Sequence, residues 1–273
     1  MHGTRHFLRI LLVSMGVFSA AAAHAACSRV INVPMSATGQ SVMIDGDTIS
    51  GIYPDLLRSL SDKEGCTFAM SDVPRARLEI LFETGRADLL IPASKTPKRD
   101  ALGTFVALIH NRATLLSIQS NRATIKTMRE LQDNNSKLKV ALVRGFDYGQ
   151  VYQELITTLG KQGRLILEVD ALSVARLLKA GTADVSIMAP TILAGAVQSD
   201  ERVRDIVDKL RIEPLDDLPW GDSGVYISNT ALNPQDKAAL QDALERAARS
   251  GEVWKGFQRY YSPAILKGSI RPL

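Results

Sequence analysis

Residues 81–93 read LFETGRADLLIPA and residues 177–189 read LLKAGTADVSIMA, with six identical positions. In both stretches a helix-like segment ends at a glycine, Gly85 or Gly181, and an Ala-Asp pair leads into an apolar run of strand length. Glycine often ends helices because it adopts the left-handed conformation without steric cost, and continuous apolar runs are typical of buried parallel strands. The same helix-to-strand junction therefore occurs twice, which indicates two α/β units.

The chain on either side of these junctions alternates segments of strand length with segments of helical period. Strands are predicted at 30–33, 67–70, 87–91, 139–143, 165–169, 183–188 and 224–228. Helices are predicted from Ile52 to Gly65, through Leu78 to Gly85, and at 148–159, 172–180, 234–250 and 253–260. The predicted fold class is α/β with two lobes, each a mostly parallel sheet flanked by helices, hinged by two crossover segments.

The N-terminal segment has the pattern of a secretory signal peptide. Arg5 and Arg9 precede an apolar run, and the small-residue site Ala23-His24-Ala25 follows it. The run is shorter than the roughly 20 residues that a spanning helix needs, so we expect cleavage after residue 25 rather than a retained anchor. Without the leader, 31 basic and 29 acidic residues give a net charge of +2. So small a surplus, without a basic run, argues against a nucleic-acid partner.

Export to an oxidising compartment favours a disulfide between the two cysteines, Cys27 and Cys66. Each cysteine stands just before an apolar run, so if the two runs are adjacent parallel strands, the thiols lie at the same end. Lipid anchoring through Cys27 is the alternative. It is disfavoured because a lipoprotein signal normally has an aliphatic residue where His24 stands.

Histidine-based and metal-based chemistry has little support in the chain. After cleavage His110 is the single histidine, so neither a zinc site nor a Ser/His/Asp triad has its usual ligands or partners. We interpret His110 as a loop residue and Gly221-Asp222-Ser223-Gly224 as a turn. No glycine-rich nucleotide-binding motif is present. We predict no catalytic residue, no metal site and no cofactor.

The sequence resembles the periplasmic solute-binding proteins of family 3, the type that serves polar amino-acid importers. The segments that carry the resemblance are GIYPDL (51–56), SKTPKR (94–99) and VALVRG (140–145), together with the two junctions described above. The resemblance implies a divergent member with the two-lobed type II binding fold. It implies that residues 26–118 and 222–273 form the first lobe and residues 119–221 the second.

In that family an arginine at the end of the [ST]-x-[ST]-x-x-R segment clamps the carboxylate of the ligand, which assigns this role to Arg99 with Ser94 nearby. A guanidinium suits it because it donates two parallel hydrogen bonds to a carboxylate. The chain departs from the family at Gly145-Phe146-Asp147, where hydroxyl residues are usual, and at Ala189-Pro190, where amino-acid binders carry an acid for the ammonium group. Position alone adds Arg75, Arg77, Arg144, Tyr148 and Trp220 as candidates.

The resemblance implies a periplasmic, monomeric binding subunit of an ABC-type importer, which captures an anionic or zwitterionic solute and delivers it to a membrane permease. The two departures leave two interpretations: Asp147 takes the place of the missing acid and receives the ammonium group, or the ligand is not an α-amino acid. We favour an organic acid or an atypical amino acid. Two alternatives stay open. One is an enzyme of the same fold, similar to the periplasmic dehydratases of cyclic acids, with Asp147 or Asp222 as its acid. The other is a sensory module that docks on a membrane receptor kinase.

Overall fold

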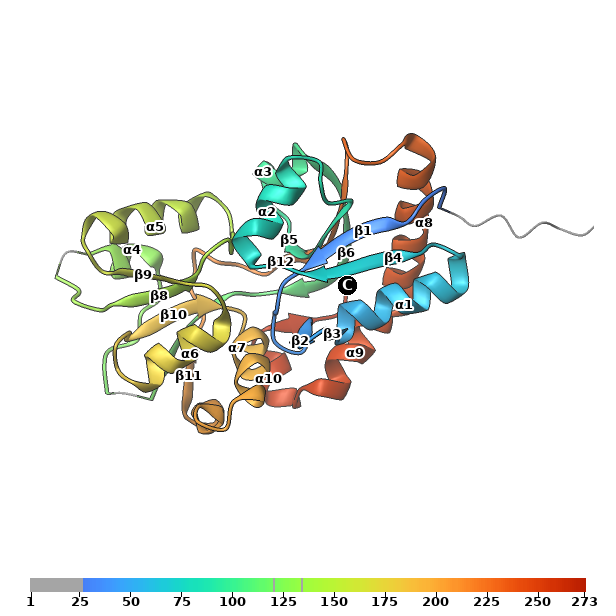
Figure 1. The fold of residues 1–273 in the computed structure, drawn as a ribbon. Helices are drawn as coiled ribbons and strands as arrows, with labels where there is room; N and C mark the ends of the chain where they lie inside the picture. The colour runs from blue at the N-terminus through green and yellow to red at the C-terminus, as the bar shows by residue number, and fades with distance from the viewer. Residues whose placement is uncertain (1–26, 120, 134) are drawn as a thin grey trace, which may run out of the picture.

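Two lobes lie side by side in the computed structural model, which describes residues 27–119, 121–133 and 135–273 (Figure 1). The signal peptide predicted for residues 1–25 lies outside the described residues. The first lobe contains β1 (Ile31–Met35), β2 (Met43–Asp45), β3 (Thr48–Ser50), α1 (Ile52–Glu64), β4 (Phe68–Asp72), α2 (Arg75–Glu83), β5 (Leu89–Ser94), α3 (Pro97–Asp100), β6 (Gly103–Asn111), β12 (Gly221–Ser228), α8 (Pro234–Ser250), α9 (Glu252–Tyr260), α10 (Pro263–Lys267) and β13 (Ile270–Arg271). The second contains β7 (Thr114–Ile118), α4 (Met128–Gln132), β8 (Val140–Val143), α5 (Gln150–Lys161), β9 (Leu165–Glu168), α6 (Ala171–Lys179), β10 (Val185–Met188), α7 (Pro190–Ala196), the 3-10 helices η1 (Val197–Ser199) and η2 (Arg204–Lys209), and β11 (Leu210–Glu213).

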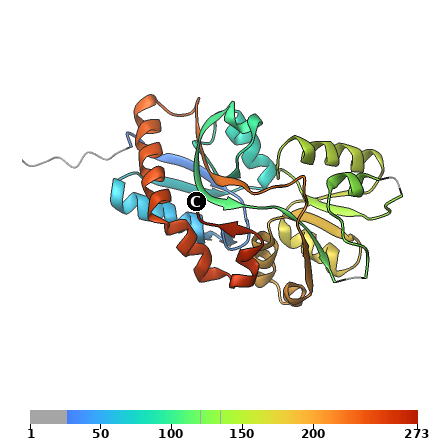
Figure 2. The same ribbon diagram turned by 180° about the vertical axis from the view of Figure 1, so that it is seen from behind.

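The chain crosses between the lobes through two connections that run side by side. In the first lobe β6 pairs with β12, and in the second β7 pairs with β11, both antiparallel. Figure 2 shows these segments from behind. The strand β7 therefore belongs by its hydrogen bonds to the sheet of the second lobe, and the chain first crosses between β6 and β7. Residue 118, where the sequence analysis ends the first part of the first lobe, is the last residue of β7, whereas the chain passes from β6 to β7 between Asn111 and Thr114.

The sheets are mixed rather than mostly parallel. The first lobe has a parallel pair, β1 and β4, beside a four-stranded sheet in the order β13-β6-β12-β5, in which every pair is antiparallel. The second lobe has a five-stranded sheet in the order β11-β7-β10-β8-β9, in which β8, β9 and β10 are parallel and the β7 and β11 pairs are antiparallel. Parallel neighbours need a crossover helix, and where the connection is short or returns from the other lobe the strands run antiparallel. The prediction of mostly parallel sheets is wrong for the four-stranded sheet.

The repeated Ala-Asp junction has the same structure in both lobes. The Asp88 N–H donates to the carbonyl oxygen of Asn32 at 2.9 Å, and the Asp88 carboxylate accepts from the Asn32 N–H at 2.7 Å. The Asp184 N–H donates to the carbonyl oxygen of Lys139 at 2.9 Å, and its carboxylate accepts from the Lys139 N–H at 2.7 Å. Each aspartate thus fixes the start of a neighbouring strand, β1 or β8. This shared function explains the likeness of the two stretches.

The segment Gly221–Gly224 is a strand, so its interpretation as a turn is wrong. It forms the first half of β12, paired with β6, and a register shift falls at Gly224. A Cβ at Gly224 would lie 1.9 Å from the carbonyl oxygen of Val106, so glycine is required there by the close approach of β6. His110 likewise lies in β6 rather than in a loop, and its Nδ1 is 2.8 Å from the Asp222 carboxylate.

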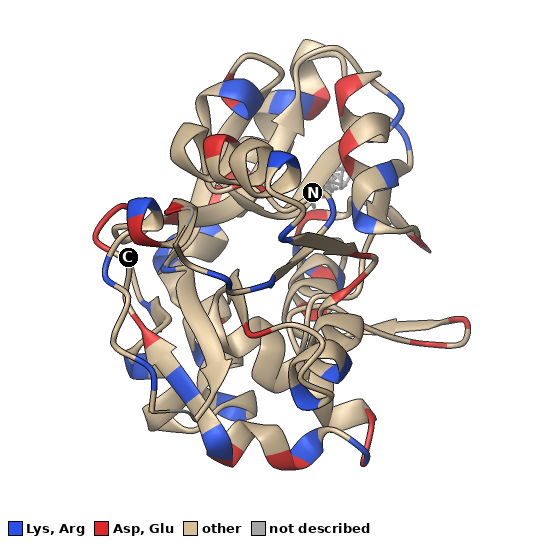
Figure 3. Ribbon diagram, turned by 90° about the vertical axis from the view of Figure 1, so that its left-hand side faces the viewer, with Lys and Arg blue, Asp and Glu red and all other residues tan. Residues whose placement is uncertain are grey.

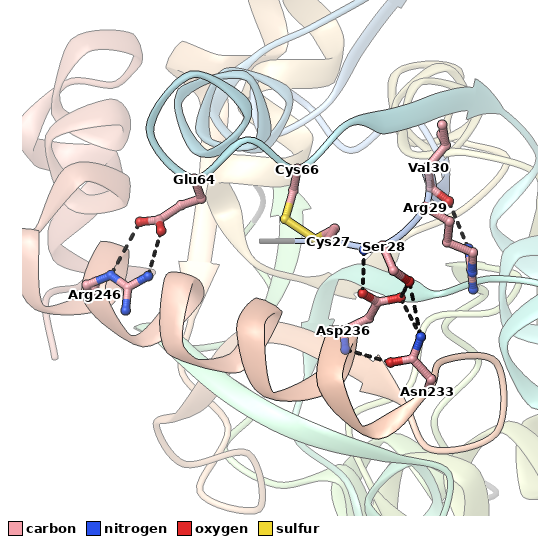
Figure 4. The surroundings of a disulfide bond; sticks show 9 residues. All are labelled: Cys27, Ser28, Arg29, Val30, Glu64, Cys66, Asn233, Asp236 and Arg246. Atoms are coloured by element: carbon pink, nitrogen blue, oxygen red, sulfur yellow. Dashed lines mark hydrogen bonds and ion pairs between the residues drawn. A yellow bond between two sulfur atoms is a disulfide. The ribbon is translucent and has the colours of Figure 1, made fainter. Parts of the chain in front are cut away.

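A disulfide joins Cys27 and Cys66, as the compartment argument predicts (Figure 4). The cysteines precede the parallel strands β1 and β4, and their Cα atoms are 5.0 Å apart. The next residue, Ser28, donates to both carboxylate oxygens of Asp236 on α8 at 2.7 and 2.8 Å. Because the disulfide occupies the Cys27 Sγ, the structure has no thiol at that position for a lipid anchor.

The helix α7 joins the two lobes. Although it follows β10 of the second lobe, its Ala194 belongs to the apolar core of the first lobe. Gly195 faces the loop after β1, where a Cβ would lie 2.5 Å from the Gln40 backbone nitrogen and 2.5 Å from the Tyr261 hydroxyl. The two backbones therefore touch directly at this point. No helix among the described residues is both long enough and apolar enough to span a membrane.

Candidate functional site

A small cavity lies between the lobes, beyond the carboxyl ends of β5 and β8. Its volume is about 50 Å³. Both lobes contribute to its wall, which combines two arginines, several hydroxyl groups, an amide and a carboxylate with apolar side chains. The lining residues are Thr38, Arg75, Pro92, Ala93, Ser94, Arg99, Asn111, Phe146, Asp147, Tyr148, Ile192 and Ser223.

The loop after β5 positions Arg99. Thr96 is the N-cap of the short helix α3, and its backbone N–H donates to the Tyr226 hydroxyl at 3.0 Å. The Tyr226 hydroxyl in turn donates to the Asp100 carboxylate at 2.8 Å. These contacts fix α3 on the four-stranded sheet. The Arg99 side chain is 3% exposed, and its Nη1 donates to the Ser94 carbonyl oxygen at 2.9 Å.

The carboxylate that Arg99 binds in this structure comes from the chain itself. Glu79, on α2, accepts from Arg99 Nε at 3.3 Å and from Arg99 Nη2 at 2.8 Å. Sequence reasoning missed Glu79, although the i,i+4 spacing of Arg75 and Glu79 on a predicted helix is a signal for pairing. The family resemblance assigned the Arg99 guanidinium to a solute carboxylate, and in the structure two of its nitrogens, Nε and Nη2, donate to Glu79.

Arg75 is the second buried arginine of the site, at 5% side-chain exposure. Its Nη2 donates to Glu79 at 2.6 Å and its Nη1 donates to the Pro92 carbonyl oxygen at 2.9 Å. Its Nε is buried and has no hydrogen-bond partner among the described residues. Glu79 therefore lies between two guanidinium groups.

Burial and charge act in opposite directions on these groups. Burial lowers the pKa of Arg75 and would raise the pKa of Glu79. The charges of Arg75 and Arg99, together with their hydrogen bonds, outweigh burial at Glu79 and hold its pKa below the ordinary value. Glu79 is therefore an anion that compensates one of the two arginines.

The second lobe closes the cavity with the loop between β8 and α5. Gly145 packs on the start of α2, where a Cβ would lie 2.9 Å from the Ala76 backbone nitrogen, and its φ of 89° also favours glycine. Phe146 and Tyr148 line the cavity with rings 6.2 Å apart. Burial raises the pKa of Tyr148, so its hydroxyl stays protonated. Asp147 also lines the cavity, and its Oδ1 accepts from the Gly149 N–H at 2.9 Å.

Three other candidates lie outside the cavity wall. Arg77 is exposed on α2, and Arg144 is exposed after β8. Trp220 is half-buried, and the Arg271 guanidinium lies 4.6 Å from its ring centroid. The structure thus brings together Arg75, Ser94, Arg99, Phe146 and Asp147, with Gly145 behind them. It adds Thr38, Asn111 and Ser223 in the wall and Glu79 beside it, and no sequence motif marks these four residues for binding beyond the spacing noted above.

Metal ligands do not gather in the described part of the chain, where no three His, Cys, Asp or Glu residues are placed to hold an ion.

Solved structures with the same architecture are numerous, whereas no protein-family model and no curated protein matches this sequence. A histidine kinase sensor domain with similarity to periplasmic binding proteins shares 17% identity over 86% of this chain and 96% of its own, with a TM-score of 0.67. The amino-acid ABC transporter substrate-binding protein AbpA from Streptococcus pneumoniae, bound to L-arginine, shares 19% over 84% and 93%, with a TM-score of 0.66. The ancestral amino acid-binding protein AncCDT-1, a precursor of cyclohexadienyl dehydratase, shares 16% over 85% and 96%, with a TM-score of 0.65.

The chain has the periplasmic binding protein fold. The coverage is nearly complete in both directions, so the resemblance includes both lobes and the double crossover. At these identities the likeness establishes the fold alone, and the three proteins are described as one sensor domain and two amino-acid-binding proteins. The function of this protein, which has the periplasmic binding protein fold, must therefore be argued from its own cavity.

Proposed function

We propose that the chain is an exported solute-binding protein that captures a small carboxylate-bearing solute between its lobes. The observation that carries the proposal is a pair of buried arginines, Arg75 and Arg99, in the wall of an interlobe cavity. Arginines are rarely buried without a function or a partner, and here one carboxylate serves both. The Ser94 and Ser223 side chains in the same wall supply neutral hydrogen-bond groups.

A binding role fits the cavity better than catalysis. The enzyme alternative names Asp147 or Asp222 as its acid. Asp222 lies outside the cavity wall beside His110, and the Asp147 Oδ1 accepts from the Gly149 N–H and from Gln153 Nε2. His110, the single histidine of the described residues, lies in β6 with Asp222 and is not part of the cavity wall. The proposal therefore assigns no catalytic residue.

The proposed partner is the membrane permease of an ABC-type importer, with a monomeric binding subunit in the periplasm. The alternative is a membrane receptor kinase that reads the solute-bound form. A nucleic-acid partner is not proposed, because Figure 3 shows basic and acidic residues interspersed over both lobes of the described chain rather than a basic stripe.

The experiment is a thermal-shift screen of residues 26–273 against amino acids, monocarboxylates, dicarboxylates and aromatic acids, followed by calorimetry of each hit. A ligand present at about 100 times its Kd raises the free energy of unfolding by about 2.7 kcal/mol. We expect a hit with a stoichiometry of one solute per chain. The absence of any carboxylate hit at concentrations of tens of millimolar would contradict the proposal.

A bacterial strain that lacks the gene for this protein distinguishes the permease from the receptor kinase as the partner. Loss of uptake of the labelled solute supports the permease. Retained uptake with loss of a transcriptional response to the solute supports the kinase.

A further inference from the structure

The cluster of Arg75, Arg99 and Glu79 at the cavity carries an excess positive charge. Arg75 and Arg99 are 5% and 3% exposed, and Glu79, the acid between them, is 17% exposed. Two guanidinium groups and one carboxylate leave one buried positive charge without a counter-charge inside the cluster. A buried charge without a partner is costly, so an anion that reaches the cavity is favoured there.

The hydrogen-bond donors locate the place for that anion at Arg75 rather than at Arg99. Arg99 directs Nε and Nη2 to Glu79 and Nη1 to the Ser94 carbonyl oxygen. Arg75 uses Nη1 and Nη2 in the same way, on Pro92 and Glu79, but its buried Nε has no partner among the described residues. Arg75 also lines the cavity. Of the six guanidinium nitrogens of Arg75 and Arg99, the Arg75 Nε is therefore the one without a hydrogen-bond partner among the described residues.

The other charges near the cluster do not change this balance. Lys98 pairs with Glu83 at 2.6 Å, outside the cavity wall. Asp147 is in the wall but is partly exposed, and its Oδ1 accepts from the Gly149 N–H and from Gln153 Nε2. These bonds to its loop and to α5 hold the Oδ1 within the second lobe, and solvent screens the charge of this partly exposed side chain.

The size and chemistry of the cavity restrict the anion further. A volume of about 50 Å³ suits a group of few heavy atoms. Ser94, Ser223 and Asn111 offer hydroxyl and amide groups for a second oxygen. Ala189 and Pro190 stand where the amino-acid binders of the resembling family carry an acid, so no such acid receives an ammonium group there.

We propose that Arg75 is the anion-binding residue of the cavity and that Glu79, by holding Arg99, sets the selectivity of the cavity for a compact solute with one carboxylate and no second charge. The proposal rests on the proposed function and names the class of solute. Glu79 acts through Arg99 and Arg75 and is therefore a positioning residue. Its removal raises the uncompensated charge of the cluster from one to two.

The experiment is isothermal titration calorimetry with acetate, glycine and malonate at constant ionic strength. Acetate has one carboxylate, glycine adds an ammonium group, and malonate adds a second carboxylate. We expect the wild type to bind acetate roughly tenfold more tightly than glycine or malonate, and Arg75→Lys to weaken acetate binding roughly tenfold. Arg86→Lys, at an exposed arginine of the same lobe, is the matched control and leaves binding unchanged. In Glu79→Gln the preference moves from acetate to malonate.

The outcomes separate this proposal from the proposed function. If no carboxylate binds either to the wild type or to Glu79→Gln, the proposed function itself fails. If carboxylates bind but Arg75→Lys has no more effect than Arg86→Lys, or Glu79→Gln leaves the order of acetate and malonate unchanged, only the present proposal fails. If Arg75→Lys does not fold, the order of the three probes on the wild type and its reversal in Glu79→Gln still decide the matter.

Discussion

Glu79 and Arg99 meet at two points, because the Glu79 carboxylate accepts from both Nε and Nη2 of the guanidinium. The guanidinium that the family resemblance assigned to a solute therefore binds a carboxylate within the first lobe, between α2 and α3. Both side chains are largely buried, at 17% and 3% exposure. This relationship makes Arg99 part of the fold as well as part of the cavity wall.

We predict that Arg99→Ala destabilises the protein strongly. The change leaves the buried Glu79 with one guanidinium instead of two and removes the bond to the Ser94 carbonyl oxygen. Breaking a buried ion pair by removing one partner costs about 3 kcal/mol or more. Urea unfolding of the wild type and the variant measures the difference. Arg86→Ala, an exposed arginine, is the control, and we expect it to change stability by less than about 0.5 kcal/mol. Equal effects of the two changes would show that the Arg99 pair contributes little.

The ion pairs of Glu79 with Arg75 and Arg99 also predict that the unfolding free energy depends on pH. The pKa of Glu79 in the folded protein lies below its ordinary value near 4.5, because the two arginines favour the carboxylate over the effect of burial. Its stabilising contribution is therefore fully present above that value and is lost as the pH falls through the folded pKa. We expect the difference in unfolding free energy between the wild type and Glu79→Gln to be constant at neutral pH and to shrink in acid. A difference in unfolding free energy that grows in acid would contradict the lowered pKa of Glu79 in the folded protein.

Local signals in the sequence were sufficient for most of the fold. The period of Ile52, Leu56, Leu57 and Leu60 predicts α1, and all four side chains are buried, while Gly65 ends the helix with a φ of 71°. The strands that were misjudged depend on partners distant in the sequence. Gly221–Gly224 has the composition of a turn, but it forms a strand because its backbone pairs with β6.

The candidate site was predictable only in part. Motif position located Ser94, Arg99 and the loop at 145–147, and the structure brings these residues to one cavity or its edge. Motif position could not show that the Glu79 carboxylate binds the Arg99 guanidinium, because that contact depends on how α2 packs against α3. Hydrogen bonds between such segments follow from packing and leave no spacing rule in the sequence.

The disulfide gives a third prediction about stability. The bond between Cys27 and Cys66 closes a loop of 39 residues in sequence separation, and it holds the N-terminal segment on the first lobe (Figure 4). In the chain-entropy model, a crosslink that closes a loop of this length lowers the entropy of the unfolded chain and stabilises the fold by about 4 kcal/mol. We expect Cys27→Ser/Cys66→Ser to lower the unfolding free energy by that order, measured in urea without reductant. Reductant should destabilise the wild type and leave the double variant unchanged. If both proteins unfold at the same urea concentration, the disulfide does not stabilise the fold.

Two glycines of β12 provide a matched pair for a packing test. A Cβ at Gly224 would lie 1.9 Å from the Val106 carbonyl oxygen, whereas a Cβ at Gly221 has no atom within 4 Å. We expect Gly224→Ala to cost about 3 kcal/mol or more, because the backbone of β6 must move, and Gly221→Ala to cost less than about 1 kcal/mol. Circular dichroism melting curves of the two variants measure the contrast. Similar melting temperatures would mean that β6 and β12 are less closely paired at the bulge.

The contact of Gly195 with the first lobe links packing to binding. A Cβ there would lie 2.5 Å from the Gln40 backbone nitrogen and 2.8 Å from the Gly39 Cα, so Gly195→Ala must move α7 away from the first lobe. Gly160→Ala, in α5, is the control because its Cβ would have one neighbour at 3.9 Å, the Leu165 Cδ2. We expect Gly195→Ala to lower the unfolding free energy by about 1 to 3 kcal/mol.

The same change should weaken carboxylate binding, because the cavity wall comes from both lobes and loses its shape when they separate. Small-angle X-ray scattering should then show a larger radius of gyration for Gly195→Ala than for Gly160→Ala. Calorimetry with acetate should show a loss of affinity of roughly tenfold in Gly195→Ala alone. A variant with the wild-type radius and affinity would mean that the lobes absorb the extra methyl group without separating, and that the α7 contact does not control the cavity.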